Sequence, residues 1–257
     1  MSEEIIEQDP WASLKAFTTA RIALGRTGTA IPLREVLNFR LAHAHARDAV
    51  YSALSVNTLQ EQLQPFHIPV LLLHSKAGDR HEYLQRPDKG RQLDVDSIAL
   101  LEKTDSGYLH KDVAIILADG LSATAMNVHT KPLLEVLIPL LKNAGLSLAP
   151  ICMVQQGRVA SGDEAGQILQ AKLTLMLIGE RPGLSAADSM GAYITFAPKP
   201  GITDEARNCI SNIREEGLQY EAAAQKILYL VMEAIRLKLT GVALKDNTSL
   251  ENAGLLE

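Results

Sequence analysis

The sequence KLTLMLI at Lys172–Ile178 runs directly into GERPGL at Gly179–Leu184. The first seven residues form a short, mostly apolar run, which is typical of a strand buried on both faces of a sheet. The Gly, Pro and Gly that follow predict a tight loop. Ligands of open α/β sheets bind beyond the carboxyl ends of the strands, so Glu180 and Arg181 stand where a ligand would lie. The alternative for this loop is an ordinary solvated turn, which is common.

Strand, loop and helix alternate on both sides of this stretch. Apolar runs predict strands, and apolar residues at helical spacing predict helices. The predicted strands are 69–74, 112–118, 147–154, 172–178 and 191–197, and the helices of the same part of the chain are 95–103, 130–145, 161–170 and 221–240. Thr203 is expected to cap a further short helix that contains Cys209. This alternation predicts an α/β fold with a doubly wound, mostly parallel sheet.

The N-terminal quarter has a different pattern. Residues 1–66 are expected to be mainly helical, with helices over 11–21, from Pro32 onward, and over 56–63. Between the first two of these, Arg21 and Arg26 alternate with glycines. That segment is either an exposed basic turn or a binding segment. In the second case the two arginines would contact an anion or a partner, since a guanidinium can bind a carboxylate through two nitrogens. Residues 67–245 are expected to form the α/β domain, and the polar tail 246–257 to be loose.

Composition excludes several classes of protein. The 257 residues carry a net charge of −5, with no basic surplus for a nucleic-acid backbone. The two cysteines, Cys152 and Cys209, are too few for a disulfide scaffold and suit a reducing cytosol. The acidic start, MSEEIIE, lacks the pattern of a secretion signal, and no apolar run is long enough to span a membrane. We therefore expect neither a nucleic-acid partner nor a membrane partner.

Familiar cofactor motifs are missing after the predicted strands. There is no G-x-G-x-x-G, no H-E-x-x-H, no C-x-x-C and no G-x-S-x-G. Gly157 and Gly162 have the spacing of a P-loop, but Asp163 stands where lysine is needed to reach phosphate. His43 and His45 are two residues apart, so they point to different faces of a helix and cannot share a metal. A nucleotide-type sheet without a phosphate-binding loop indicates another kind of ligand.

Six short motifs, in order along the chain, resemble those of one family: the small (light, β) subunit of ethanolamine ammonia-lyase. The resemblance covers about Thr18 to Gly241, and six motifs in order are far more specific than any one of them. The motifs are Thr19-Ala20-Arg21-Ile22 with Gly25-Arg26 and Gly28; Tyr83-Leu84 with Arg86-Pro87-Asp88 and Gly90-Arg91; Asp119-Gly120-Leu121-Ser122; Gly157-Arg158-Val159; Gly179-Glu180-Arg181-Pro182-Gly183-Leu184; and Cys209-Ile210-Ser211-Asn212-Ile213.

The resemblance implies a carbon–nitrogen lyase that converts ethanolamine to acetaldehyde and ammonia by a radical mechanism. A large (heavy, α) subunit, a TIM-type barrel, would hold the substrate. The small subunit, with a Rossmann-like domain over 67–245, would hold adenosylcobalamin from the other side, with its region 1–66 touching the large subunit. Several such pairs would form a hetero-oligomer in the cytoplasm, with enclosure in a bacterial microcompartment in doubt because the similarity begins within the first 20 residues.

Three cofactor contacts follow from the matched motifs. Val159 is expected at the corrin edge, and Glu180 is expected to accept hydrogen bonds from the amides that fringe the cofactor. Cys209 is expected to line the same pocket as an inert thiol. No catalytic residue and no metal ligand is expected on this chain. Asp79-Arg80-His81 begins like the D-x-H-x-x-G motif of other cobalamin proteins but has Leu84 at the glycine position, so the cofactor is expected to stay base-on.

Two other functions stay open on the sequence alone. A stand-alone oxidoreductase or transferase with a similar sheet would need a phosphate loop, which the sequence lacks. A non-catalytic partner that only stabilises the large subunit differs in one respect: its Glu180 loop would not touch cofactor.

Overall fold

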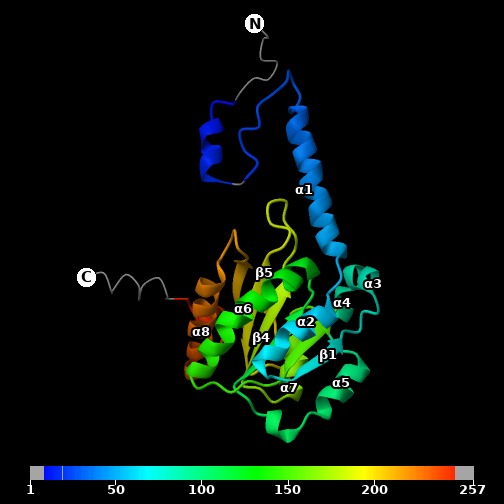
Figure 1. Ribbon diagram of the computed structural model, residues 1–257, viewed down its shortest axis with the longest axis vertical. Coiled ribbons are helices and arrows are strands. Elements are labelled where there is room, and N and C mark those ends of the chain that lie inside the picture. Colours follow the sequence, from blue (N-terminus) through cyan, green and yellow to red (C-terminus); the bar gives the residue numbers. More distant parts are fainter. Residues whose placement is uncertain (1–8, 19, 247–257) are drawn as a thin grey trace, which may run out of the picture.

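The computed structural model describes residues 9–18 and 20–246. A six-stranded sheet carries helices on both faces, and an N-terminal arm extends away from it (Figure 1). The strands are β1 Val70–His74, β2 Val113–Ala118, β3 Ile151–Gln155, β4 Leu173–Gly179, β5 Met190–Phe196 and β6 Asn208–Ile213. The α-helices are α1 Leu33–Tyr51, α2 Val56–Leu63, α3 Arg80–Gln85, α4 Pro87–Gly90, α5 Val95–Glu102, α6 Ala123–Asn143, α7 Ser161–Ile168 and α8 Tyr220–Leu237. Short 3-10 helices are η1 Ala12–Phe17, η2 Gln64–Phe66, η3 Ser106–Tyr108, η4 Asp204–Ala206 and η5 Gly241–Ala243. Apart from its first residue, the predicted tail 246–257 lies outside the described residues.

The sheet is mixed, so the prediction of a mostly parallel sheet is wrong. Its order is β1-β3-β2-β4-β5-β6. The pairings β1–β3, β3–β2 and β2–β4 are parallel, whereas β4–β5 and β5–β6 are antiparallel. No helix lies between β4 and β5, and a parallel neighbour needs a crossover of a dozen or more residues. The short link from β4 therefore returns the chain directly as an antiparallel strand.

The core lies on both faces of the sheet. Residues of α2, α6 and α8 pack with one face, and α2 and α6 cross in front of the strands in Figure 1. Residues of α5 and α7 pack with the other face. Every residue of β2 and β4 is buried, which explains why β2 is apolar throughout and β4 is apolar apart from Thr174. None of the described helices is both long enough and apolar enough to cross a lipid bilayer.

Two helix predictions, one for the segment after β2 and one for the segment around Cys209, are wrong. Helix α6 begins at Ala123 rather than at residue 130, because the Ser122 side chain accepts a hydrogen bond from the Ala125 amide and caps it. The predicted short helix around Cys209 is strand β6 instead. Only η4 follows Thr203, and it ends before that strand. Ile210 and Ile213 are buried from β6, which packs with α8.

Residues 80–85 and 87–90 form the short helices α3 and α4, and Asp79 caps α3 by accepting a hydrogen bond from the Glu82 amide. The N-cap of α7 is Ala160. The expected helix over 11–21 is reduced to η1, which buries none of its residues.

We call the described residues 9–18 and 20–51 the N-terminal arm. It consists of η1, an irregular link and α1, and Figure 1 shows α1 pointing away from the sheet. Only Pro32 and Ala49 are buried in the arm. A helix of 19 residues extends about 28 Å at 1.5 Å per residue, so the arm reaches well beyond the α/β body.

Candidate functional site

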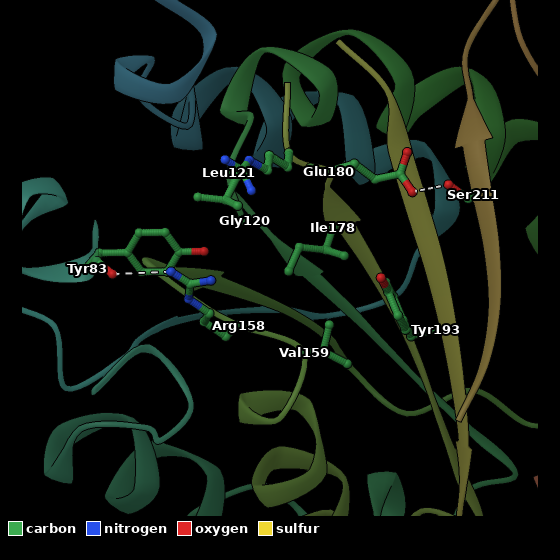
Figure 2. A pocket seen from close by; sticks show the side chains of 11 residues that line it. Tyr83, Gly120, Leu121, Arg158, Val159, Ile178, Glu180, Tyr193 and Ser211 are labelled. Atoms are coloured by element: carbon green, nitrogen blue, oxygen red, sulfur yellow. Dashed lines mark hydrogen bonds between the residues drawn. The ribbon is translucent and has the colours of Figure 1, made fainter. Parts of the chain in front are cut away.

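A pocket of about 440 Å³ lies at the carboxyl ends of the parallel strands β2, β3 and β4. It is where the sequence placed a ligand, because parallel strands bring their following loops to one edge of the sheet. Figure 2 shows Tyr83 and Arg158 at one end and Glu180, Ser211 and Tyr193 at the other, with Ile178 and Val159 between them. The lining residues are Tyr83, Gly120, Leu121, Arg158, Val159, Ile178, Gly179, Glu180, Arg181, Tyr193 and Ser211.

Two glycines let the loops after β2 and β4 touch. The Leu121 amide donates to the Gly179 carbonyl at 2.9 Å. A Cβ on Gly120 would overlap that same carbonyl, and a Cβ on Gly179 would overlap the carbonyl of Ser122. Gly120 also has φ +55°, which favours glycine. The close approach of these two loops therefore depends on the absence of side chains.

Asp119, directly after β2, fixes the loop after β3. Its carboxylate is buried and accepts hydrogen bonds from the amides of Gln156 at 3.0 Å and Gly157 at 3.1 Å. Gln156 has φ +53°, an unusual conformation for a residue with a side chain. Burial raises the pKa of Asp119, while these two amides and the nearby Arg80 oppose the rise. Asp119 thus positions the segment that carries Val159, a role that the sequence did not reveal.

Tyr83 and Arg158 form one wall of the pocket. The Arg158 guanidinium lies 4.5 Å from the centre of the Tyr83 ring. The Tyr83 hydroxyl donates to the Gly157 carbonyl at 3.3 Å, and burial raises the pKa of Tyr83 to about 12, so it stays a neutral phenol. The Nε nitrogen of Arg158 is buried without a hydrogen-bond partner among the described residues. The Arg158 Nη2 donates to the Tyr83 carbonyl at 3.4 Å, so the two residues hold this wall together.

Glu180 lies at the opposite end, where it joins β4 to β6. Its carboxylate accepts hydrogen bonds from the Ser211 hydroxyl and from the Asn212 amide, the latter at 3.0 Å. Asn212 has φ +61°, so the chain is bent at this contact. Each carboxylate oxygen has two lone pairs, so each keeps a further position for an acceptor contact. The GERPGL loop is therefore more than a solvated turn, because its glutamate, which follows β4, holds the end of β6 across β5.

The structure brings two of the three predicted site residues into the pocket wall. Val159 and Glu180 line the pocket, whereas Cys209 does not. Cys209 is an exposed residue on β6 whose register partner on β5, Tyr193, is one of the lining residues. Cys209 is thus paired with a pocket-lining residue on the adjacent strand but does not line the pocket itself. Sequence reasoning expected it in a helix, where this pairing would not exist.

Other charged residues singled out from the sequence lie away from this pocket. Arg21 and Arg26 are exposed on the arm, where the Arg21 guanidinium lies 5.4 Å from the Phe39 ring centre. His43 and His45 are exposed on α1. Within the part of the chain that the structure describes, no three metal-binding side chains are grouped as a metal site would need.

Comparison with known proteins identifies close relatives over nearly the whole chain. A family model described as "Ethanolamine ammonia-lyase light chain" matches residues 8–245. An ethanolamine ammonia-lyase small subunit of Pseudomonas putida (strain GB-1) is 53% identical over 250 residues, which cover 96% of this chain and 92% of the relative. One from Pseudomonas aeruginosa (strain LESB58) is 51% identical over 245 residues, covering 95% and 90%. One from Xanthomonas campestris pv. campestris is 53% identical over 240 residues, covering 93% and 88%.

Proposed function

Because the chain belongs to the family of ethanolamine ammonia-lyase light chains, we propose that it is the small subunit of an adenosylcobalamin-dependent ethanolamine ammonia-lyase. In this proposal it holds the cobalamin at the interface with a large subunit that carries the substrate site. The bound cofactor supplies the radical that starts the conversion of ethanolamine to acetaldehyde and ammonia. The observation that carries the proposal is that two motifs that follow consecutive strands, with Val159 and Glu180, open onto one pocket.

The residues of the pocket fit one side of a corrinoid. Apolar side chains of Leu121, Val159 and Ile178 would face a ring, while the free acceptor positions of Glu180 would meet the amides on its edge. A corrinoid is much larger than the drug-sized ligands that such pockets enclose. A volume of 440 Å³ therefore suits one part of it, and a second chain would supply the rest. Cys209 would contact the same group from β6.

Residues 67–245 are proposed to be a Rossmann-like cobalamin-binding domain. The support is the pair of crossovers β2–α6–β3 and β3–α7–β4, whose helices pack on opposite faces of the sheet, and the pocket where they diverge. Its unpaired cysteines, Cys152 and Cys209, suit the reducing cytoplasm in which we place the assembly.

We also propose that the cofactor keeps its own dimethylbenzimidazole as lower ligand. His81, the histidine of the incomplete D-x-H-x-x-G motif, is exposed on α3 and does not line the pocket. Its ring lies 3.3 Å from the Gln85 amide. In the EPR spectrum of the Co(II) form, made with nitrogen-15-labelled histidine, no histidine coupling is expected. A histidine coupling would show that this part of the proposal is wrong.

Replacing Glu180 with alanine is expected to weaken cobalamin binding by the reconstituted two-subunit complex by about tenfold or more, since hydrogen bonds to a charged group contribute about 1.5–3 kcal/mol. The change also frees Ser211 and Asn212 from the loop. The measurement is a cobalamin titration of the complex, followed by an acetaldehyde assay.

Glu102→Ala is the matched control, because Glu102 is an exposed glutamate at the end of α5. If Glu180→Ala leaves cobalamin affinity at the level of this control, the chain is a stabilising partner of the large subunit without a cofactor role. If the small subunit adds no activity to the large subunit at all, the proposal of a lyase subunit fails.

The N-terminal arm is proposed as the main contact with the large subunit. Nine of the eighteen exposed large apolar side chains in the described chain are on the arm, although it is about a sixth of the residues. Leu33, Leu37 and Leu41 form a stripe at i, i+4 and i+8 on α1. The arm carries six basic and three acidic residues in a chain of net charge −5. An apolar and basic surface of this kind fits an acidic partner surface with apolar pockets.

Leu37→Asp is expected to weaken association with the large subunit by roughly tenfold or more, because it removes an apolar anchor and places a like charge against an acidic partner. Leu37 is 53% exposed, so the melting temperature of the isolated chain should barely change. Val95→Asp, at an exposed valine at the start of α5, is the control. Equal association constants for the two variants would contradict a docking role for the arm.

A further inference from the structure

One arginine connects the arm to the pocket. Arg80 is the first residue of α3, and its side chain is 14% exposed. Its Nε donates at 2.6 Å to the carbonyl of Val50, in the last turn of α1. Its Nη1 donates at 2.8 Å to the carbonyl of Gly120, which lines the pocket. The two nitrogens of one rigid guanidinium thus hold the base of the arm and the loop after β2 at a fixed separation.

The same guanidinium contacts the other loops at this edge. Nη1 lies 3.3 Å from the Gln156 side-chain oxygen and 3.8 Å from the Asp119 carboxylate. The guanidinium carbon is 4.7 Å from the ring centre of Tyr83. Nη2 is buried and has no hydrogen-bond partner among the described residues. Every contact of Arg80 beyond the arm is therefore with a residue that lines the pocket or positions its loops.

The other contacts at the base of the arm do not reach the pocket. The Ser52 hydroxyl accepts from the Thr124 amide, and Asn127 exchanges hydrogen bonds with Ser55 and Ala53. These bonds fasten the chain after α1 to the first turns of α6. They hold the arm on the body without touching a pocket-lining residue.

We propose that Arg80 is a positioning residue that couples docking of the arm to cobalamin binding. The inference rests on the proposed function, because it assumes that the arm meets the large subunit and that the pocket holds the cofactor. When a partner fixes the orientation of α1, the Val50 carbonyl fixes Arg80, and Arg80 holds Gly120 and Gln156 in the arrangement that shapes the pocket. By linkage, cobalamin in the pocket favours the docked arm by the same factor.

Lysine cannot replace this arginine. The Lys side chain ends in a single nitrogen, whereas Arg80 donates from separate nitrogens to carbonyls on two segments. Arg80→Lys keeps the charge near Asp119 but loses one of the two donors. Arg80→Gln loses the charge as well. These two variants separate the geometric link from the electrostatic one.

The test is the ratio of two dissociation constants. Association of the small subunit with the large subunit is measured by sedimentation or by a surface-binding assay, without cobalamin and with saturating cobalamin. In the wild type, cobalamin should tighten association by a factor in the usual range of roughly 5–150-fold. In Arg80→Gln and Arg80→Lys this factor should fall to about twofold or less. Because both constants come from the same variant, loss of stability alone does not change their ratio.

Arg236→Gln is the control, since Arg236 pairs with Glu233 on the exposed side of α8 and should keep the wild-type factor. Arg80→Lys carries the test if Arg80→Gln shows no cooperative melting transition. A wild-type factor retained in the folded Arg80 variants would overturn the coupling role while leaving the proposed function intact. If cobalamin does not change the association constant of the wild-type subunits, the cofactor does not bind at their interface. Both the coupling role and the proposed function would then be wrong.

Discussion

Gly179→Ala is expected to destabilise the chain by about 3 kcal/mol, the upper end of the usual cost of overpacking, and it should remove the pocket in whatever folded population remains. The added Cβ would overlap the carbonyl oxygens of Ser122 and Asp119, which are backbone atoms. Neither can move freely. Ser122 caps α6 and its hydroxyl donates to the Ala187 carbonyl, while Asp119 holds the loop after β3. Overpacking that a side-chain rotation cannot relieve costs about 1–3 kcal/mol or more.

Gly183→Ala is a matched control within the same hexapeptide. A Cβ on Gly183 would have its nearest neighbour at 3.5 Å, an ordinary van der Waals contact. Urea denaturation of the two variants measures the difference directly. Gly183→Ala should lie within about 0.5 kcal/mol of the wild type, as is usual for surface changes. Similar unfolding free energies for the two variants would refute the close approach of the β2 and β4 loops.

Arg207→Met should lower the free energy of unfolding by about 3–5 kcal/mol, because it leaves the Asp163 carboxylate buried without its partner. Both side chains are 1% exposed. Arg207 binds Asp163 in a two-pronged geometry, with both nitrogen–oxygen distances at 2.6 Å. It also donates to the Thr195 hydroxyl and the Ile202 carbonyl. The pair therefore ties α7 to β5 and to the segment that leads into β6.

The size of this loss should depend on pH with a defined sign. Burial raises the pKa of Asp163, and the hydrogen bonds from Arg207 lower it. Without Arg207 the rise caused by burial is opposed only by the more distant Arg91, so the folded variant binds a proton that the unfolded chain releases. Stability then falls as pH rises above the ordinary pKa of aspartate, about 3.9. Denaturation of Arg207→Met at pH 5 and pH 8 should show the larger loss at pH 8.

Two further variants make the interpretation specific. The double variant Asp163→Leu with Arg207→Met should recover most of the stability, since neither charge remains buried. Arg236→Met removes an exposed arginine that pairs with Glu233, and it should cost no more than about 1 kcal/mol. A double variant as unstable as the single one would indicate that packing, rather than the unpaired charge, causes the loss.

Much of the structure around the pocket could be predicted from short stretches of sequence. The apolar runs of β2 and β4 gave both strands within about a residue, because strands buried on both faces need apolar residues throughout. The loops with Val159 and Glu180 followed from those strands and from β3, and they do line one pocket. The family resemblance, read from six ordered motifs, is confirmed by the relatives.

The errors arose where distant contacts decide the local structure. Strand β6 has few apolar residues, and its conformation depends on pairing with β5 and on Glu180 holding the Asn212 amide. Asp163 looked like a failed P-loop position, yet its partner lies 44 residues away. The antiparallel direction of β5 could have been found from the sequence, since the ten residues between β4 and β5 leave no room for a crossover helix.

The GERPGL stretch separates most clearly what the local sequence determines from what tertiary contacts decide. By itself the sequence determined that a buried strand ends in a glycine-flanked loop with a glutamate at its start, because hydrophobic burial and backbone freedom act on neighbouring residues. Only the tertiary structure decided what that loop touches. Gly179 is needed because another loop passes against it, and Glu180 is oriented because β6 ends beside it. Arg80 likewise gains its position from Val50 and Gly120, residues 30 and 40 positions away, which no local pattern places together.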